Sequence, residues 1–226
     1  MNELFAPNGP APAAAEAPSE SLLQHADELS RRAVEAAAPL RLEIVDEPAV
    51  LEAIYRLRYQ VVVERGWARP EDLPGGREVD DFDEMALHLA AWDGEQLAAT
   101  SRIVLPANGL VLPTERAFGM RFEPHGQVAD MGRQIVARPY SGIQHVVFGA
   151  LLAQTWLEVH SRGLTYVGGD FTPAVTRLYR LMGFDVQQLG PARTYWSEER
   201  FPIVVDIAKS VPALLRRWGR LLQRGT

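Results

Sequence analysis

The sequence predicts an α/β (α+β) fold in which helices flank a mixed, mainly antiparallel β-sheet in three layers, helix–sheet–helix. Three observations predict it. Short runs of branched apolar residues alternate with longer stretches of helical spacing. The dipeptide Asp93-Gly94 joins two neighbouring runs as a hairpin. Helical stretches separate the later runs, as crossovers within one sheet do. With 226 residues, 47% of them hydrophobic, the chain can build one substantial core.

The two ends of the chain differ in composition from its middle. Residues 1–20 are rich in alanine and proline, and we expect a disordered tail there. A helix is expected over residues 21–39, with Ser21 as its N-cap. The folded unit is expected over residues 40–208. It is followed by a basic helix over residues 209–226, which carries Arg216, Arg217, Arg220 and Arg224.

Capping and breaking residues divide the folded unit into elements. Pro48 favours the first turn of a helix that has Asp46 as its expected N-cap and ends before Gly66. Ser141 is expected to open a long amphipathic helix, and Gly183 to end a later one. The expected strands cover residues 40–45, 85–92, 96–105, 127–137, 164–168, 184–189 and 201–207. The expected helices cover residues 48–65, 141–160 and 172–182, and residues 106–126 are expected to be irregular.

The composition narrows the class of protein. A net charge of -6 and a pI of about 5.4 argue against nucleic acid as the main partner. The absence of cysteine excludes disulfides, thiolate nucleophiles and cysteine-ligated metals. No apolar run approaches the roughly 20 residues that span a bilayer, and the first residues lack a signal-peptide pattern. We therefore expect a cytoplasmic protein.

Several charged residues occupy unusual places. Arg102 and Asp130 lie inside apolar runs that read as core strands, where a charge is costly unless it is paired or used in chemistry. Glu78, Asp80 and Asp83 follow one another in a polar loop. Three acids are too few for a calcium site, and the five histidines show no zinc spacing, so no metal site is expected. The charges indicate a polar active site.

The order and spacing of these residues match known motifs. The run Tyr179-Arg180-Leu181-Met182-Gly183-Phe184 resembles the late helix-to-strand step of the GNAT acyltransferase fold, and the order of the expected elements matches that fold. An Arg and a Trp come first, then Glu-x-Asp-x-x-Asp, then a strand Arg, and last an acid followed three residues later by Arg. These motifs fall on Arg58, Trp67, Glu78, Asp80, Asp83, Arg102, Asp130 and Arg133. Over roughly residues 40–208, the chain resembles the acyl-homoserine-lactone (autoinducer) synthases of quorum sensing.

Three departures from that family's pattern leave the acceptor open. Asp130 stands where the family has a glutamate, Val62 stands where it has a phenylalanine, and the spacing from Arg58 to Trp67 is one residue short. The run Tyr55–Val61 also resembles two sibling groups, the N-acyl amino acid synthases and the exosortase-associated acyltransferases. A non-catalytic GNAT-like binding domain is a further alternative.

The resemblance implies an N-acyltransferase. It would move a fatty acyl group from acyl-acyl-carrier-protein to the amine of a small amino-acid-like acceptor, which in a lactone synthase is S-adenosylmethionine, with no permanently bound cofactor. Asp130, as general base, and Arg133 would be the catalytic residues. The alternative for the charged residues is an ion-pair network that fixes the loop to the sheet. The amine substrate would be held by Arg58, Trp67, Glu78, Asp80, Asp83 and Arg102.

The segment after the expected strand 127–137 is the place for the donor's phosphate. It carries one glycine, Gly142, where a coenzyme A site of this fold wants two, which favours the single phosphate of a phosphopantetheine arm bound by Arg138, Ser141 and Gly142. Apolar residues such as Phe148 of the long helix would line an acyl tunnel, or only pack the core. Acyl carrier protein is acidic, and its docking face would include Arg138, Arg162, Arg177 and Arg180. The terminal helix is a second docking candidate, or a peripheral contact with anionic lipid.

Overall fold

The computed structural model of the protein describes residues 20–222, with the backbone alone for residues 219–222. The predicted tail over residues 1–20 therefore lies outside the described residues, except for Glu20. Arg224 and the side chain of Arg220 lie outside them as well. None of the helices in the described part of the chain is long and apolar enough to cross a bilayer.

Eight strands form one mixed sheet in the order β1-β2-β3-β4-β5-β8-β6, with β7 paired to β8 off this path. The pair β4–β5 is parallel, and every other pair is antiparallel. The strands are β1 (Arg41–Val45), β2 (Leu87–Asp93), β3 (Gln96–Val104), β4 (Val128–Val136), β5 (Tyr166–Phe171), β6 (Asp185–Gln188), β7 (Arg193–Tyr195) and β8 (Glu198–Asp206).

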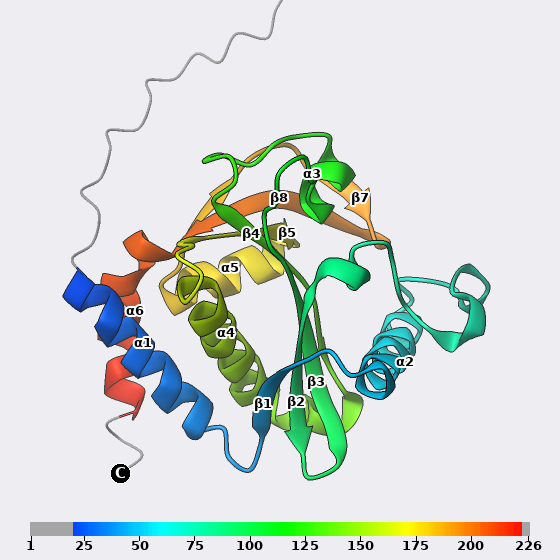
Figure 1. Cartoon of the computed structure of the whole chain (residues 1–226), viewed down its shortest axis with the longest axis horizontal. Coiled ribbons are helices and arrows are strands. Elements are labelled where there is room, and N and C mark those ends of the chain that lie inside the picture. The colour runs from blue at the N-terminus through cyan, green and yellow to red at the C-terminus, as the bar shows by residue number, and fades with distance from the viewer. Residues whose placement is uncertain (1–19, 223–226) are drawn as a thin grey trace, which may run out of the picture.

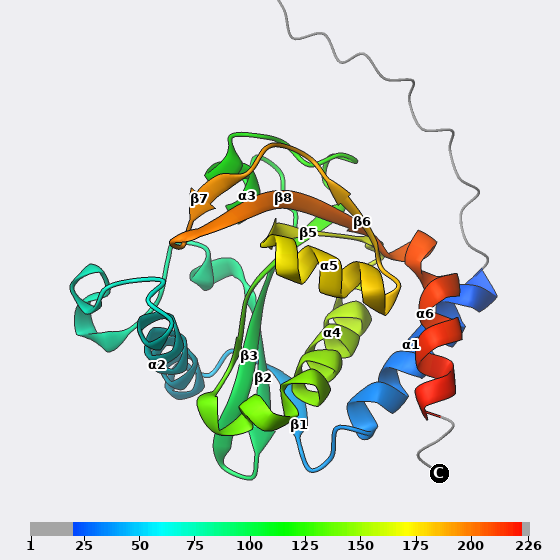
Figure 2. The same cartoon turned by 180° about the vertical axis from the view of Figure 1, so that it is seen from behind.

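Helices cover both faces of the sheet (Figures 1 and 2). Those of the described chain are α1 (Glu20–Glu35), α2 (Pro48–Glu64), α3 (Pro113–Phe118), α4 (Gln144–His160), α5 (Pro173–Met182) and α6 (Ile207–Leu222). Packing of α2 and α3 buries one face, where Ile54 meets Ala90 and Phe122 meets Val204. Packing of α4 and α5 buries the other, where Trp156 and Tyr179 share one apolar cluster. The predicted three-layer fold is confirmed.

Helices α1 and α6 form an outer shell beside α4 (Figures 1 and 2). A single carboxylate of α1 anchors it: Asp27 accepts hydrogen bonds from Trp156 Nε1 at 2.7 Å and from His160 Nδ1 at 2.8 Å. The rings of Trp156 and His160 are stacked with their centroids 4.7 Å apart, so the Asp27 carboxylate holds both rings in place. A neighbouring core position, Ala26, is buried against α4.

Several local predictions are confirmed. Gly94 takes a φ of +60° in the hairpin between β2 and β3, a conformation that glycine adopts without strain. Gly183 ends α5 in the left-handed region with a φ of 103°. Pro48 occupies the first turn of α2.

Other local predictions are wrong. Asp46 is not the N-cap of α2; that position is Glu47, which makes no capping hydrogen bond through its side chain. Ser141 does not open the long helix, because a 3₁₀ turn over Arg138–Ile143 precedes α4. That helix is also not amphipathic, since the sheet covers one side and α1 the other. Ser21 lies within α1 and not at its N-cap.

The segment predicted to be irregular, residues 106–126, holds a helix, α3. The connection between β6 and β8 holds an extra strand, β7. Pro113 starts α3, and Gly119 ends it with a φ of 64°. Both signals are present in the sequence, but the helix is only 6 residues long and carries no periodicity. The terminal helix α6 begins at Ile207, five residues before Pro212, which lies inside it.

Candidate active site

Three arginines and three carboxylates form a closed network on the α2 and α3 face of the sheet. Helix α2 contributes Arg58, which donates to both oxygens of Asp83, at 2.7 and 3.1 Å, and to Glu78. Strand β3 contributes Arg102, which contacts Asp80 at 2.6 Å and Asp83 at 3.1 Å. The six formal charges cancel once Arg133 of β4 is included, which contacts Glu78 at 3.1 Å and Asp80 at 2.9 Å.

Burial divides the network into an inner and an outer part. The inner part consists of Arg58, Glu78, Asp83 and Arg102, whose side chains are at most 3% exposed. Burial alone would raise the pKa of Asp83, but the hydrogen bonds and charge of Arg58, with the charge of Arg102, lower it to about 2. The loop that carries the three acids is thereby fixed to the sheet, as the ion-pair alternative predicted.

The outer part faces solvent. The side chain of Arg133 is 12% exposed and that of Asp80 is 24% exposed. Arg133 has a φ of 52°, and the pairing of β3 with β4 shifts register between Thr100 and Arg102, which defines a β-bulge. In a regular strand, Arg133 would face away from Asp130, since the two are three residues apart. The bulge turns Arg133 towards the network.

The turn between β7 and β8 closes over Arg133. Trp196 and Ser197 both have positive φ, 54° and 55°, which is rare for residues other than glycine. The indole of Trp196 lies 4.7 Å from the guanidinium carbon of Arg133, and Ser197 Oγ donates to the carbonyl of Trp67 at 3.3 Å. This turn was missed in the sequence because it contains neither glycine nor asparagine.

A cavity of about 640 Å³ opens where β4 and β5 part. The two strands pair only as far as Asp130 opposite Gly168, and the rest of β4 is free on that side. A cavity of this size suits a substrate of moderate size. It is bounded by the bulged part of β4, the end of α2, the starts of α4 and α5, and the β7–β8 turn. Its polar and aromatic wall consists of Arg65, Trp67, Arg133, Gln134, Gln144, His145, Asp170, Thr172, Tyr195, Trp196, Glu198 and Arg200.

The structure does not bring Asp130, the predicted base, to this cavity. Asp130 faces α3, where its carboxylate accepts hydrogen bonds from Thr114 N at 2.6 Å and Thr114 Oγ1 at 3.1 Å. Burial raises the pKa of Asp130 to about 7 despite these bonds. The residue is 3% exposed and does not line the cavity.

The predicted phosphate site also lies outside the cavity lining. Arg138, Ser141 and Gly142 are exposed in the 3₁₀ turn before α4, because that helix begins later than expected. The cavity is lined instead by the next two residues of α4, Gln144 and His145.

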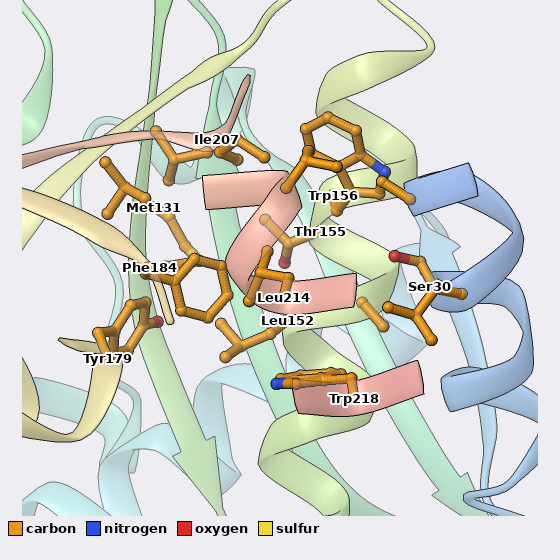
Figure 3. A pocket seen from close by; sticks show the side chains of 16 residues that line it. Ser30, Met131, Leu152, Thr155, Trp156, Tyr179, Phe184, Ile207, Leu214 and Trp218 are labelled. Atoms are coloured by element: carbon orange, nitrogen blue, oxygen red, sulfur yellow. The ribbon is translucent and has the colours of Figure 1, made fainter. Parts of the chain in front are cut away.

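A second, apolar cavity lies between the sheet and the outer helices, and Figure 3 shows its side chains. Its volume is about 50 Å³, several times what one water molecule needs. Met131 lines both cavities, and Tyr179 of the apolar cavity packs against Phe148 and Phe171 of the larger one. Helices α1 and α6 form its outer wall with Ser30 and Trp218, and Thr155 faces it with a buried hydroxyl that has no hydrogen-bond partner among the described residues.

The order and pairing of the helices and strands are those of a GNAT-like fold. A family model for an acetyltransferase (GNAT) domain matches residues 57–148. The fold class inferred from the sequence is confirmed by solved structures.

The chain is similar to BjaI, a CoA-dependent acyl-homoserine lactone synthase, solved with SAM and isopentyl-CoA. That similarity has a TM-score of 0.62 and 23% identity over 80% of this chain and 90% of BjaI. The similarity to FeeM, an N-acyl amino acid synthase from uncultured soil microbes, has a TM-score of 0.61 and 17% identity over 76% of this chain and 92% of FeeM. The similarity to LasI, an AHL synthase, has a TM-score of 0.60 and 18% identity over 74% of this chain and 90% of LasI.

Proposed function

We propose that the protein is an N-acyltransferase that moves a fatty acyl group from a thioester donor to the amine of a small acceptor. The observation that carries this proposal is the shape of the cavity. One wall is charged and aromatic, and Met131, on another wall, also lines the neighbouring apolar cavity. An acceptor and an acyl chain therefore have chemically distinct places that meet where β4 and β5 part.

The reaction is aminolysis of the thioester. The amine nitrogen attacks the thioester carbon, the N–C bond forms, and the C–S bond breaks. Backbone N–H groups of the free edge of β4, over residues 131–134, would stabilise the oxyanion, because no neighbouring strand occupies that edge. Arg133, which keeps part of its exposure, would order the acceptor against Trp196. No acyl-enzyme is expected, because the chain has no cysteine.

The acceptor wall suits an amino-acid-like cation with a planar or cationic group. Trp67 and Trp196 offer aromatic faces to such a group. BjaI was solved with SAM and isopentyl-CoA, and S-adenosylmethionine is the acceptor we propose. Arg58, Glu78, Asp83 and Arg102 would act by holding the loop and Asp80 in place, since they are buried.

The second cavity would take the far end of the acyl chain. Ala153 of α4 lines it and is 3% exposed. Ala153→Leu would fill the cavity and shift the preferred donor to shorter chains, measured as kcat/KM over a series of chain lengths. The exposed Ala174→Leu of α5 is the matched control and leaves the profile unchanged.

For the donor we propose acyl-acyl-carrier-protein. Among the described residues, Arg138 and Arg177 are exposed and make no ion pair, whereas Arg162 binds Glu158 at 2.8 Å and Arg180 donates to the carbonyl of Val186. The exposed guanidinium groups of Arg138 and Arg177 suit the docking of an acidic carrier protein. BjaI uses CoA, so the test compares both donors: Arg177→Glu should raise KM for acyl-carrier-protein alone.

Mass spectrometry of lipid extracts from a bacterium that expresses the protein tests the function. An acyl-homoserine lactone is the expected product. A long-chain acyl amino acid would identify the second candidate, an N-acyl amino acid synthase, which the similar TM-score of FeeM supports equally well. If no product forms and the purified protein consumes neither acyl-carrier-protein nor acyl-CoA thioesters, the non-catalytic alternative replaces both.

A further inference from the structure

The cavity holds only two carboxylates among the described residues, Asp170 and Glu198. Aminolysis needs a group that takes a proton from the acceptor's ammonium, within hydrogen-bond reach. His145 also lines the cavity but is exposed at the start of α4, where water surrounds it. The two acids are therefore the candidates for the base.

Asp170 lies beside the point where the strands part. The last parallel pair is Asp130 opposite Gly168. A Cβ on Gly169 would lie 2.8 Å from the carbonyl oxygen of Met131, so the backbones of β4 and β5 touch there. Asp170 is the next residue of β5, and its carboxylate is therefore held close to the free edge of β4, where the thioester is proposed to bind.

The two oxygens of Asp170 differ in their surroundings. One accepts a hydrogen bond from Arg200 at 2.9 Å. The other oxygen accepts no hydrogen bond from the described residues. It is not a fully buried atom, so it remains accessible from the cavity. Arg200 is held in turn by Glu198 at 2.7 Å, which orients the guanidinium towards Asp170. Glu198 is the more exposed acid, at 34% against 16%.

The environment favours proton affinity. Burial raises the pKa of Asp170, although the charge and hydrogen bond of Arg200 oppose the shift. Such a carboxylate takes a proton more readily than one at the surface, while the charge of Arg200 favours its ionised form. Asp130 also has a raised pKa, but Thr114 donates hydrogen bonds to both of its oxygens, and Asp130 does not line the cavity.

We propose that Asp170, and not Asp130, accepts the proton of the acceptor ammonium, with Arg200 as its positioning residue. The free oxygen of Asp170 takes the proton from the ammonium nitrogen, whose lone pair then attacks the thioester carbon. The C–S bond breaks and the departing sulfur takes the proton from Asp170, while the nitrogen, cationic after the attack, releases its second proton to solvent, so that Asp170 is an anion again at the end of the cycle. This assignment rests on the proposed acyltransferase function.

The experiment compares Asp170→Asn and Asp130→Asn with the wild type, using the donor and acceptor that give turnover. Near neutral pH, Asp170→Asn should lower kcat/KM by about 100-fold or more. Its activity should recover as pH rises, because the free amine then exists without a base. Asp170→Glu should restore part of the activity at neutral pH, and donor binding, measured by calorimetry, should be unchanged. Glu115→Gln is a matched control, since Glu115 is a buried carboxylate paired with Arg121 at 3.0 Å outside the cavity.

Each other outcome overturns the assignment. A loss in Asp170→Asn that is the same at every pH, or that accompanies lost donor binding, makes the residue structural. The pH signature in Asp130→Asn alone makes Asp130 the base. A wild type without turnover on any donor refutes the proposed function, and the assignment with it, whereas an active wild type isolates the failure to Asp170.

Discussion

Arg58→Met tests whether the buried network stabilises the fold. Arg58 bridges Glu78 and Asp83, and its side chain is 1% exposed. Methionine keeps much of the length of the side chain but leaves two buried carboxylates short of a partner. Removal of one member of a buried ion pair costs about 3–5 kcal/mol. The pKa of Asp83 gives a second scale: lowering it from 3.8 to about 2 corresponds to about 2 kcal/mol from that carboxylate alone.

The same pKa sets the pH dependence. Because the pKa of Asp83 is lower in the folded state, its contribution is present above pH 3.8 and is lost as pH falls towards 2. In Arg58→Met the uncompensated Asp83 protonates at a higher pH. The difference in unfolding free energy between wild type and variant should therefore be larger at pH 7 than at pH 3.

Urea unfolding at both pH values measures these differences. The control is Arg56→Met on the same helix, whose pair with Glu52 has side chains 65% and 33% exposed. An exposed pair contributes less than about 1 kcal/mol. The reasoning is refuted if Arg58→Met costs no more than Arg56→Met, or if its cost does not change between pH 7 and pH 3.

Three further predictions concern stability. The wild type should lose about 3 kcal/mol of unfolding free energy between pH 5 and pH 8, because pH rises there through the raised pKa of Asp130, about 7. Asp130→Asn should remove this loss in urea unfolding, and a variant with the same pH dependence as the wild type contradicts the prediction. Gly168→Ala places a Cβ 2.3 Å from the ring of Phe122 and should cost about 1–3 kcal/mol by thermal melting, whereas Gly149→Ala in α4, with nothing within 4 Å, should gain up to about 1 kcal/mol. Thr155→Val removes a buried hydroxyl that has no hydrogen-bond partner among the described residues, and it should raise the unfolding free energy by about 1 kcal/mol. A lower Tm would mean that the hydroxyl makes a stabilising hydrogen bond.

The fold could be predicted because its signals are local. Asp93-Gly94 specifies its turn through the positive φ of Gly94, and Gly183 ends a helix for the same reason. The short helix α3 could not be predicted by periodicity, since too few residues exist to show it. Nothing in Trp196-Ser197 indicates a tight turn, because tertiary contacts with Trp67 and Arg133 hold it.

The site could be predicted in part. Charge inside apolar runs identified Arg102, and motif spacing brought it together with Asp83. The side on which each residue of β4 lies was not predictable, because the bulge at Arg133 changes the alternation of the strand. Asp170 gave no signal either, since the role proposed for it depends on the divergence of two strands far apart in the sequence.

The position of α1 has a consequence for anyone who works with a shortened chain. The family match begins at residue 57 and stops at 148, within α4. Yet Asp27 of α1 contacts Trp156 and His160, and Ile207 of α6 belongs to the same core cluster as Trp156. A fragment cut at the matched boundaries would lose most of α4, and the face of the sheet that this helix covers would be exposed to water. The unit that folds is therefore wider than the unit that sequence similarity recognises.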